Sequence, residues 1–163
     1  MTDFMTTKEI IVIYAATKNG VIGNSVINGM PWPRLKRDMQ FFKEKTMGAT
    51  VILGRKTFES LPGKKALPGR ENIVITRQNL SFDGCKTAHS LEEAIEMATC
   101  GRIYIIGGAE IYKLAMPLVS KIYQTTVKQD YPGDVIVEMA PGHWWAIPLY
   151  EDDQILIEEL NRA

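Results

Sequence analysis

The chain has 163 residues, of which 45% are hydrophobic and 23% are charged, and this length favours one domain that buries roughly two thirds of its unfolded surface. Its 19 basic residues balance 19 acidic ones, which argues against nucleic acid or an anionic membrane as a partner. We therefore expect a single domain over residues 1–163, with residues 1–8 as a flexible leader.

The chain begins with a strand and a long loop. Residues 10–16 form a continuous β-branched and small apolar run, typical of a central strand that is buried on both faces of a parallel or mixed sheet. Residues 18–20 have the composition of a turn, and a loop with several glycines and asparagines continues to residue 29. This loop is long enough to move.

A helical pattern follows the Met-Pro-Trp segment and ends near residue 46. Leu35, Met39 and Phe42 recur on one face, and Asp38 lies at the edge of this apolar stripe. A carboxylate that is carried into an apolar setting has a raised pKa, which makes Asp38 a candidate proton handler or cation binder. The alternative is that Asp38 sits at the helix rim and faces water, which is the commoner outcome for an aspartate.

Two further strands each lead into residues that suit phosphate binding. Residues 49–54 run directly into a short helix at residues 55–60, which begins with an arginine and a lysine. A helix start attracts anions through its backbone N–H groups, and the two side chains add positive charge. Residues 72–77 form a third strand, which ends in a threonine and an arginine.

A Ser-x-x-Glu capping box at residues 90–93 opens a helix that continues to about residue 99. A fourth strand at residues 102–106 then leads into Gly107 and Gly108, and a helix follows until a proline ends it. Two glycines at such a corner either let a ligand approach the backbone or simply make a tight turn. The fuller Gly-x-Gly-x-x-Gly pattern is absent from the sequence.

After residue 117 the pattern predicts strands only, at residues 120–127 and in a terminal hairpin with arms at residues 144–149 and 155–160. This order predicts an α/β fold with a mostly parallel sheet that ends in an antiparallel strand. Ligands bind outside the carboxyl ends of such strands, where the basic residues and glycines gather. The pattern therefore favours a phosphorylated dinucleotide as a ligand.

The remaining sequence offers little other chemistry. Cys85 and Cys100 are too few for a disulfide scaffold and too isolated for a zinc site, which suits a reducing cytoplasm. His89 and His143 stand alone, and we interpret them as surface or capping residues. No apolar run approaches the ~20 residues of a membrane-spanning helix. We expect a cytoplasmic protein with no metal and no membrane contact.

Five motifs together resemble the bacterial dihydrofolate reductase family. They are Gly20 to Gly23, Met30 to Trp32 with Asp38 and Phe42, Gly54 to Ser60, Leu67 to Asn72, and Ile106 to Tyr112. Any one of them is weak, but five in this order and approximate spacing are very specific. The resemblance runs from about residue 10 to residue 134, and it implies one domain in which about four helices flank a central, mostly parallel sheet of eight strands that ends in an antiparallel strand.

The resemblance implies the reduction of 7,8-dihydrofolate to 5,6,7,8-tetrahydrofolate by NADPH, with hydride transfer to C6 of the pterin and protonation at N5. This reaction supports one-carbon metabolism and the synthesis of thymidylate and purines. Dihydrofolate and antifolate inhibitors are the implied ligands, and a monomer is the implied state. Because the cofactor carries the hydride, the protein needs neither a catalytic triad nor a metal.

The resemblance also implies a role for individual residues. The catalytic positions are Asp38, Trp32 and Thr125, the last of which supports the carboxylate. The substrate positions are Tyr14, Ala15, Asp38, Met39, Phe42, Ser60, Leu61, Leu67, Arg70, Ile106, Tyr112 and Thr125. The cofactor positions are Ala16, Ile22, Gly23, Met30, Gly54, Arg55, Lys56, Thr57, Thr76, Arg77, Ile106, Gly107, Gly108, Ala109, Glu110, Ile111 and Tyr112. Arg70 is the implied partner of the substrate's glutamate α-carboxylate, Gly107-Gly108 the implied cis peptide, and residues 19–30 the implied mobile lid.

The sequence departs from the family pattern at several points. Tyr14 stands where a small residue is usual, and either bulks the pocket floor or fills core. Five residues, one more than in enteric bacteria, separate Trp32 from Asp38. Glu110 stands where some members of the family place an arginine for the 2′-phosphate. The preference for NADPH over NADH therefore depends on Arg55, Lys56 and Arg77. The terminal hairpin is shorter than usual, so the loop that contacts the lid is reduced or missing.

Two other functions compete with this interpretation. A reductase of the same fold could act on a ribosylaminopyrimidine of riboflavin synthesis, but such a substrate needs neither Asp38 nor Arg70. A non-catalytic folate or antifolate binder is the second alternative, and the intact set of site residues argues against it.

Overall fold

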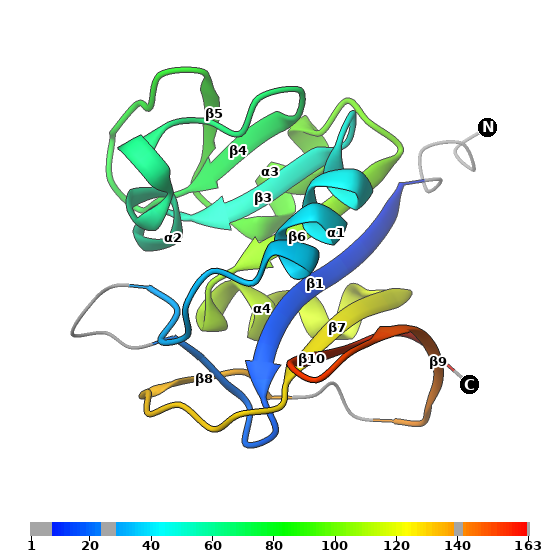
Figure 1. Cartoon of the computed structure of the whole chain (residues 1–163). Helices are drawn as coiled ribbons and strands as arrows, with labels where there is room; N and C mark the ends of the chain where they lie inside the picture. The colour runs from blue at the N-terminus through cyan, green and yellow to red at the C-terminus, as the bar shows by residue number, and fades with distance from the viewer. Residues whose placement is uncertain (1–7, 24–28, 139–141, 163) are drawn as a thin grey trace.

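The computed structural model describes residues 8–23, 29–138 and 142–162. Eight strands form one sheet in the order β5-β4-β3-β6-β1-β7-β10-β9 (Figure 1). They are β1 (Glu9–Thr17), β3 (Thr50–Gly54), β4 (Glu71–Ile75), β5 (Cys85–Ala88), β6 (Arg102–Gly107), β7 (Lys121–Val127), β9 (Trp144–Glu151) and β10 (Ile155–Arg162). β10 runs antiparallel to β7 and β9, whereas the other neighbours are parallel. The predicted sheet class is confirmed.

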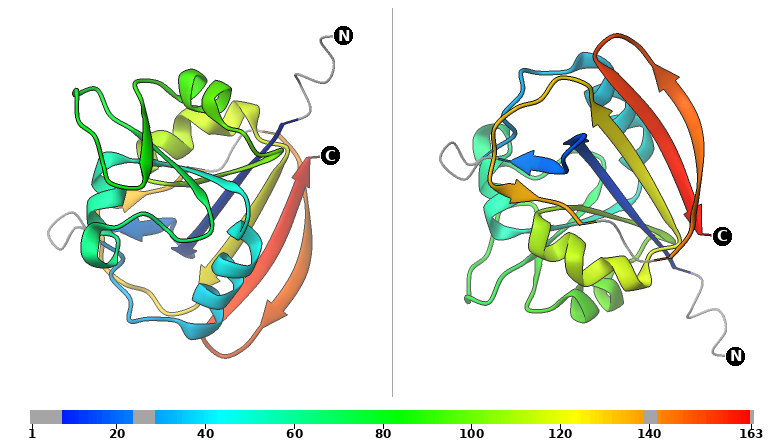
Figure 2. Two further views of the ribbon diagram at one scale, coloured as in Figure 1. Left: turned by 90° about the horizontal axis from the view of Figure 1, so that it is seen from above. Right: turned by 90° about the horizontal axis from the view of Figure 1, so that it is seen from below.

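Four helices flank this sheet in the described part of the chain, namely α1 (Lys36–Thr46), α2 (Arg55–Ser60), α3 (Leu91–Met97) and α4 (Ala109–Ala115). Two short 3₁₀ turns, Pro62–Lys64 and Met116–Leu118, follow α2 and α4. α1 lies on one face of the sheet, and α3 and α4 lie on the other (Figure 2). The predicted cap of α3 is present, because the Ser90 hydroxyl accepts a hydrogen bond of 3.0 Å from the Glu93 N–H.

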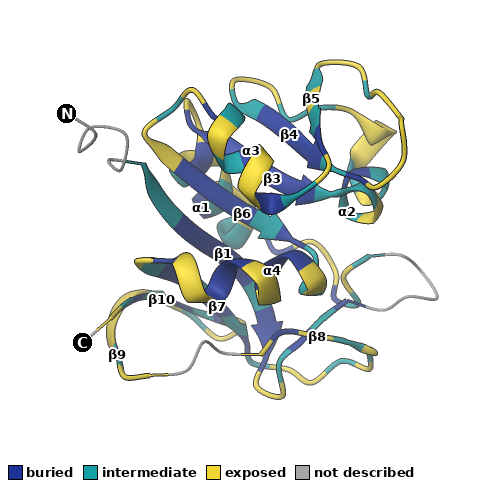
Figure 3. Cartoon of the chain, turned by 180° about the vertical axis from the view of Figure 1, so that it is seen from behind, coloured by how far each residue is buried: buried dark blue, intermediate teal, exposed yellow. Residues whose placement is uncertain are grey.

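The apolar runs that predict the central strands are buried on both faces. In β1, Ile11 and Ile13 pack on the α1 side, while Val12 and Tyr14 pack on the side of α3 and α4. Figure 3 shows the same burial along β3, β4 and β6, with exposed residues on the outer sides of α3 and α4. The carboxyl ends of these parallel strands therefore meet at one edge of a rigid layer.

Some elements have no counterpart among the predicted ones. β5 is a short strand with little apolar character, and its parallel pairing with β4 holds it in place. β2 (Val21–Gly23) pairs antiparallel with β8 (Val135–Ile136) in a second, two-stranded sheet. β2 lies in the segment predicted as a loop, and no element is predicted at β8. Residues 24–28 of the expected lid and residues 1–7 of the expected leader lie outside the described residues.

The buried face of α1 differs from the predicted stripe. Leu35 and Phe41 are buried and Phe42 is half-buried, whereas Met39 is 41% exposed. Asp38 therefore lies in the middle of the inward face rather than at its edge. The prediction is wrong because it ranks positions by hydrophobicity alone, and it misses that a polar partner on the sheet compensates the carboxylate.

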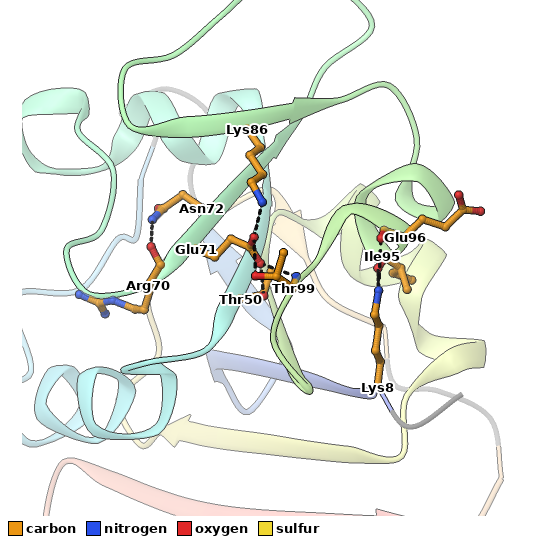
Figure 4. Close-up of polar contacts among 9 residues, drawn as sticks. All are labelled: Lys8, Thr50, Arg70, Glu71, Asn72, Lys86, Ile95, Glu96 and Thr99. Atoms are coloured by element: carbon orange, nitrogen blue, oxygen red, sulfur yellow. Dashed lines mark hydrogen bonds and ion pairs between the residues drawn. The ribbon is translucent and has the colours of Figure 1, made fainter. Parts of the chain in front are cut away.

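Glu71 ties three segments together at the amino end of β4 (Figure 4). Its carboxylate accepts hydrogen bonds from the Thr50 hydroxyl at 2.5 Å and from the Thr99 N–H at 2.9 Å and hydroxyl at 3.0 Å, and it pairs with Lys86. Burial alone raises the pKa of Glu71, but these bonds outweigh burial and lower the pKa from 4.5 to about 2. The ionised carboxylate is thus favoured by the folded state.

We expect Glu71→Gln to lower the free energy of unfolding at neutral pH by about 1–3 kcal/mol, because a half-buried acceptor loses its charge-assisted bonds. The folded pKa lies below the unfolded one, so this contribution is complete above pH 4.5 and is lost as the pH falls toward about 2. Urea unfolding of both proteins at decreasing pH checks this, and a difference that does not shrink in acid contradicts it. Glu96→Gln, at an exposed position, is the control.

Candidate active site

An acid and a hydroxyl meet between α1 and the sheet. The Thr125 hydroxyl on β7 donates a hydrogen bond of 2.6 Å to Asp38 Oδ1 in the first turn of α1. Thr125 is only 3% exposed and is paired in register with Ala15 of β1. Burial raises the pKa of Asp38, and the hydrogen bond from Thr125 opposes this only in part. Asp38 is not a rim residue in bulk water, and its carboxyl takes up a proton more readily than an exposed one.

Apolar side chains surround this pair on the α1 side of the sheet. Trp32 is buried, and its ring meets that of Tyr131 edge-on at 6.2 Å. Phe42, Leu67 and Ile106 are half-buried and pack against the same cluster as Trp32. A flat ring that enters here would therefore meet one polar group in an apolar setting.

Arg70 lies in the segment between α2 and β4. Its guanidinium donates to the Thr46 hydroxyl at 3.1 Å and, through Nε, to the Pro68 carbonyl at 3.0 Å. The buried Asn72 amide holds the same segment, because its Nδ2 donates to the carbonyls of Leu67 and Arg70 and its Oδ1 accepts from the Leu67 N–H, each at 2.9 Å. This positioning role of Asn72 is not among the predicted roles, although a polar residue at the start of an apolar strand could have indicated it.

Three glycines crowd together where β3 and β6 end. Gly107 and Gly108 are joined by a cis peptide bond, as the family resemblance implies. A Cβ atom on Gly108 would lie 3.3 Å from Thr57 Oγ1, and one on Gly54 would lie 3.4 Å from the Ile111 side chain. A side chain at Gly108 would press against Thr57, whereas one at Gly54 would make an ordinary van der Waals contact, so the tight corner after β6 favours glycine at position 108.

Cationic side chains follow β3 and β4, as the sequence predicts. Arg55 pairs with Glu59 at 2.9 Å, and Lys56 is exposed. Arg77, after β4, lies 3.6 Å from Glu110 in the first turn of α4. The positive charge at this edge is therefore partly offset by carboxylates.

Tyr14 belongs to the core behind the sheet, which decides between its two predicted roles. Its ring contacts that of Tyr112 at a centroid distance of 5.7 Å, and its hydroxyl donates to Gln124 Oε1 at 2.5 Å. The Tyr112 hydroxyl donates to the Ile13 carbonyl at 2.9 Å. Burial raises the pKa of both phenols, so both are neutral groups. Tyr14 also borders a small cavity of about 120 Å³ next to Ala16.

Four further candidates lie in elements that directly follow central strands. Ile22 and Gly23 lie in β2, which follows β1, and Ala109 and Ile111 begin α4, which follows β6. Met30 is the most exposed of the apolar candidates at 57%, and the exposed Ser60 hydroxyl donates back to the Thr57 carbonyl of its own helix.

No group of three or more His, Cys, Asp or Glu residues among the described residues could hold a metal ion. Within the same part of the chain, no helix combines the length and apolar character needed to cross a membrane.

The comparisons with known proteins agree with this geometry. The family model for dihydrofolate reductase matches residues 9–154. The chain is 44% identical over 142 residues to the type 8 dihydrofolate reductase of Escherichia coli, which covers 81% of this chain and 82% of that protein. It is 46% identical over 139 residues to the dihydrofolate reductase of Neisseria meningitidis, which covers 84% of this chain and 83% of that protein.

A solved structure is also similar. The dihydrofolate reductase of Enterococcus faecalis, complexed with NADP(H) and RAB-propyl, matches with a TM-score of 0.83 and 31% identity over 94% of this chain and 96% of that one. The resemblance that rests on the five motifs is confirmed. The chain belongs to the dihydrofolate reductase family.

Proposed function

We propose that Asp38 is the acid–base group of this reductase and that the pterin ring binds between α1 and the sheet. The chain reduces 7,8-dihydrofolate to tetrahydrofolate with NADPH. The observation that carries the assignment of the site is the hydrogen bond of 2.6 Å between Thr125 and Asp38 in an apolar setting. A carboxylate held in this way matches the one polar handle that the reaction requires.

Asp38 has a defined task in this proposal. Its ionised oxygens accept hydrogen bonds from the 2-amino group and N3 of the pterin, and this contact favours a proton at N5. Thr125 positions the carboxylate for these bonds. Trp32, Phe42 and Ile106 exclude water from the ring, which strengthens the electrostatic contact with Asp38.

The glycines and cations at the strand ends fit NADPH. When bound, NADPH supplies the hydride that reaches C6 of the pterin. We assign its phosphates to Arg55, Lys56, Thr57, Thr76 and Arg77. We assign the close approach of the rest of the cofactor to Ala16, Ile22, Gly23, Met30, Gly54, Ile106, Gly107, Gly108, Ala109, Ile111 and Tyr112. Glu110 lies beside Arg77 and so borders a phosphate. The support is the position of Gly54, Gly107 and Gly108 where β3 and β6 end, since ligands of such sheets bind outside the carboxyl ends of the strands.

The substrate positions follow the inner side of α1 and the segment after α2. We propose that Arg70 binds the glutamate α-carboxylate of dihydrofolate through its planar fork. The remaining contacts are assigned to Ala15, Met39, Phe42, Ser60, Leu61, Leu67, Ile106 and Thr125, while Tyr14 and Tyr112 fill the core behind the sheet rather than contact the substrate. Antifolate inhibitors are proposed to occupy the same place.

We further propose a cytoplasmic monomer of one domain. Cys85 and Cys100 are free thiols, which suits a reducing compartment.

The direct test is an absorbance assay with NADPH and dihydrofolate. We expect NADPH to be consumed only when both are present, and a diaminopyrimidine that binds in place of the pterin to slow the reaction. Calorimetric binding of each ligand is measured in parallel. Binding of both without consumption would identify a non-catalytic binder and overturn the proposal.

A further inference from the structure

Glu110 stands at the edge where the cations gather. Its Oε1 atom is 3.6 Å from Arg77 Nη2, and the two side chains are 77% and 92% exposed. Arg77 follows β4, while Glu110 belongs to the first turn of α4. The pair therefore bridges two elements that border the proposed cofactor site.

The strand register places this pair relative to the glycines. Gly54 is paired with Ile75, and Leu53 is paired with Gly107. The loops that follow β3, β4 and β6 therefore begin at one level of the sheet. Glu110 lies two residues beyond Gly108, and its exposed side chain lies outside the crowded glycine cluster.

The charges at this edge nearly cancel. Three cations, Arg55, Lys56 and Arg77, are accompanied by two carboxylates, Glu59 and Glu110, which leaves one net positive charge. The two arginines already face carboxylates at 2.9 and 3.6 Å. An incoming phosphate must therefore compete with Glu110 for Arg77 and is also repelled by it.

We propose that Glu110 is a specificity-determining residue that weakens binding of the 2′-phosphate of NADPH and so lowers the preference for NADPH over NADH. This inference rests on the proposed cofactor site. NADPH and NADH differ only in the 2′-phosphate. A residue that affects the binding of NADPH alone must therefore act at that phosphate. We assign the diphosphate that they share to Arg55, Lys56 and Thr57 after β3, whereas the more exposed Arg77 and Glu110 side chains suit an outer phosphate.

The test measures cofactor binding directly, by calorimetry on the full chain without substrate. We expect Glu110→Gln to lower the Kd for NADPH by about three- to tenfold, the scale of a single exposed charge near a phosphate, and to leave the Kd for NADH unchanged. The gain should shrink as salt is added, because exposed charges are screened. Arg77→Gln should raise the Kd for NADPH and leave that for NADH unchanged.

Glu44→Gln is the matched control. Glu44 lies 3.6 Å from Arg37 on α1, the same separation as in the pair at Glu110, and it is also exposed. The Glu44→Gln substitution removes the same charge from an equivalent pair that lies away from the strand ends. The Kd values for NADPH and NADH should therefore both stay as in the wild type. Equal tightening of both cofactors by Glu110→Gln, or no change in either, would overturn the inference. The two proposals fail in different experiments. Unchanged Kd values in Glu110→Gln would contradict the role of Glu110, whereas a wild type that does not consume NADPH with dihydrofolate would contradict the proposed function.

Discussion

Asp38→Asn should lower kcat/KM for dihydrofolate at neutral pH by about 10²- to 10⁴-fold, the range that a positioned acid–base group contributes. The amide keeps the shape of the side chain, and its Oδ1 can still accept the hydrogen bond from Thr125. It cannot, however, supply the negative charge that favours a proton at N5. Activity should recover in part on acidification, because substrate that is already protonated bypasses the missing carboxylate. Steady-state rates across a pH series check this result.

The same substitution should not destabilise the protein at neutral pH. Burial raises the pKa of Asp38 above its unfolded value, so the folded state binds the proton more tightly and loses stability as the pH rises through the folded pKa. Asparagine carries no charge and removes that penalty. Urea unfolding should therefore show an equal or higher free energy of unfolding for the mutant.

Wild-type activity in Asp38→Asn would remove Asp38 from the mechanism. Glu44→Gln, on the exposed face of the same helix, is the control and should keep full activity.

Arg70→Ala should raise KM for dihydrofolate by about 10- to 100-fold, because a charge-assisted bidentate contact with the α-carboxylate is lost. Arg70→Lys should recover little of this, since a lysine cannot present the planar fork. The kcat should change much less, because the carboxylate is remote from the reacting ring. Initial rates with dihydrofolate and with a dihydropterin that lacks the glutamate check the assignment.

The substrate without glutamate separates binding from folding. Arg70 also donates to Thr46 and Pro68, so its loss could shift the whole segment. A shifted segment would impair both substrates, whereas a lost carboxylate contact impairs only dihydrofolate. Equal effects on both would reject the proposed role. Arg102→Ala, at an exposed position at the amino end of β6, is the control for loss of an arginine.

The sequence predicts those parts of the fold in which local pattern and burial agree. The strand at residues 10–16 reads as a strand buried on both faces because every position is apolar or small, and β1 is buried in this way. β5 and the pairing of β2 with β8 escape prediction, because such short strands exist only through partners elsewhere in the chain. Hydrophobic periodicity wrongly predicts that Met39 faces the core. A pattern along the chain does not show that a polar partner on the sheet stabilises a carboxylate on the inward face of the helix.

The family, the class of sheet, the carboxylate beside the apolar stripe of a helix and the cations that follow the strands can all be predicted from the chain, because each depends on residue type and spacing. What these groups contact depends on the folded arrangement. Thr125 reaches Asp38 across 87 residues, Tyr14 turns to Gln124 in the core, and Glu110 meets Arg77 at the sheet edge. Such contacts depend on strand order and helix orientation, which the packing of distant segments selects and which local propensity does not encode.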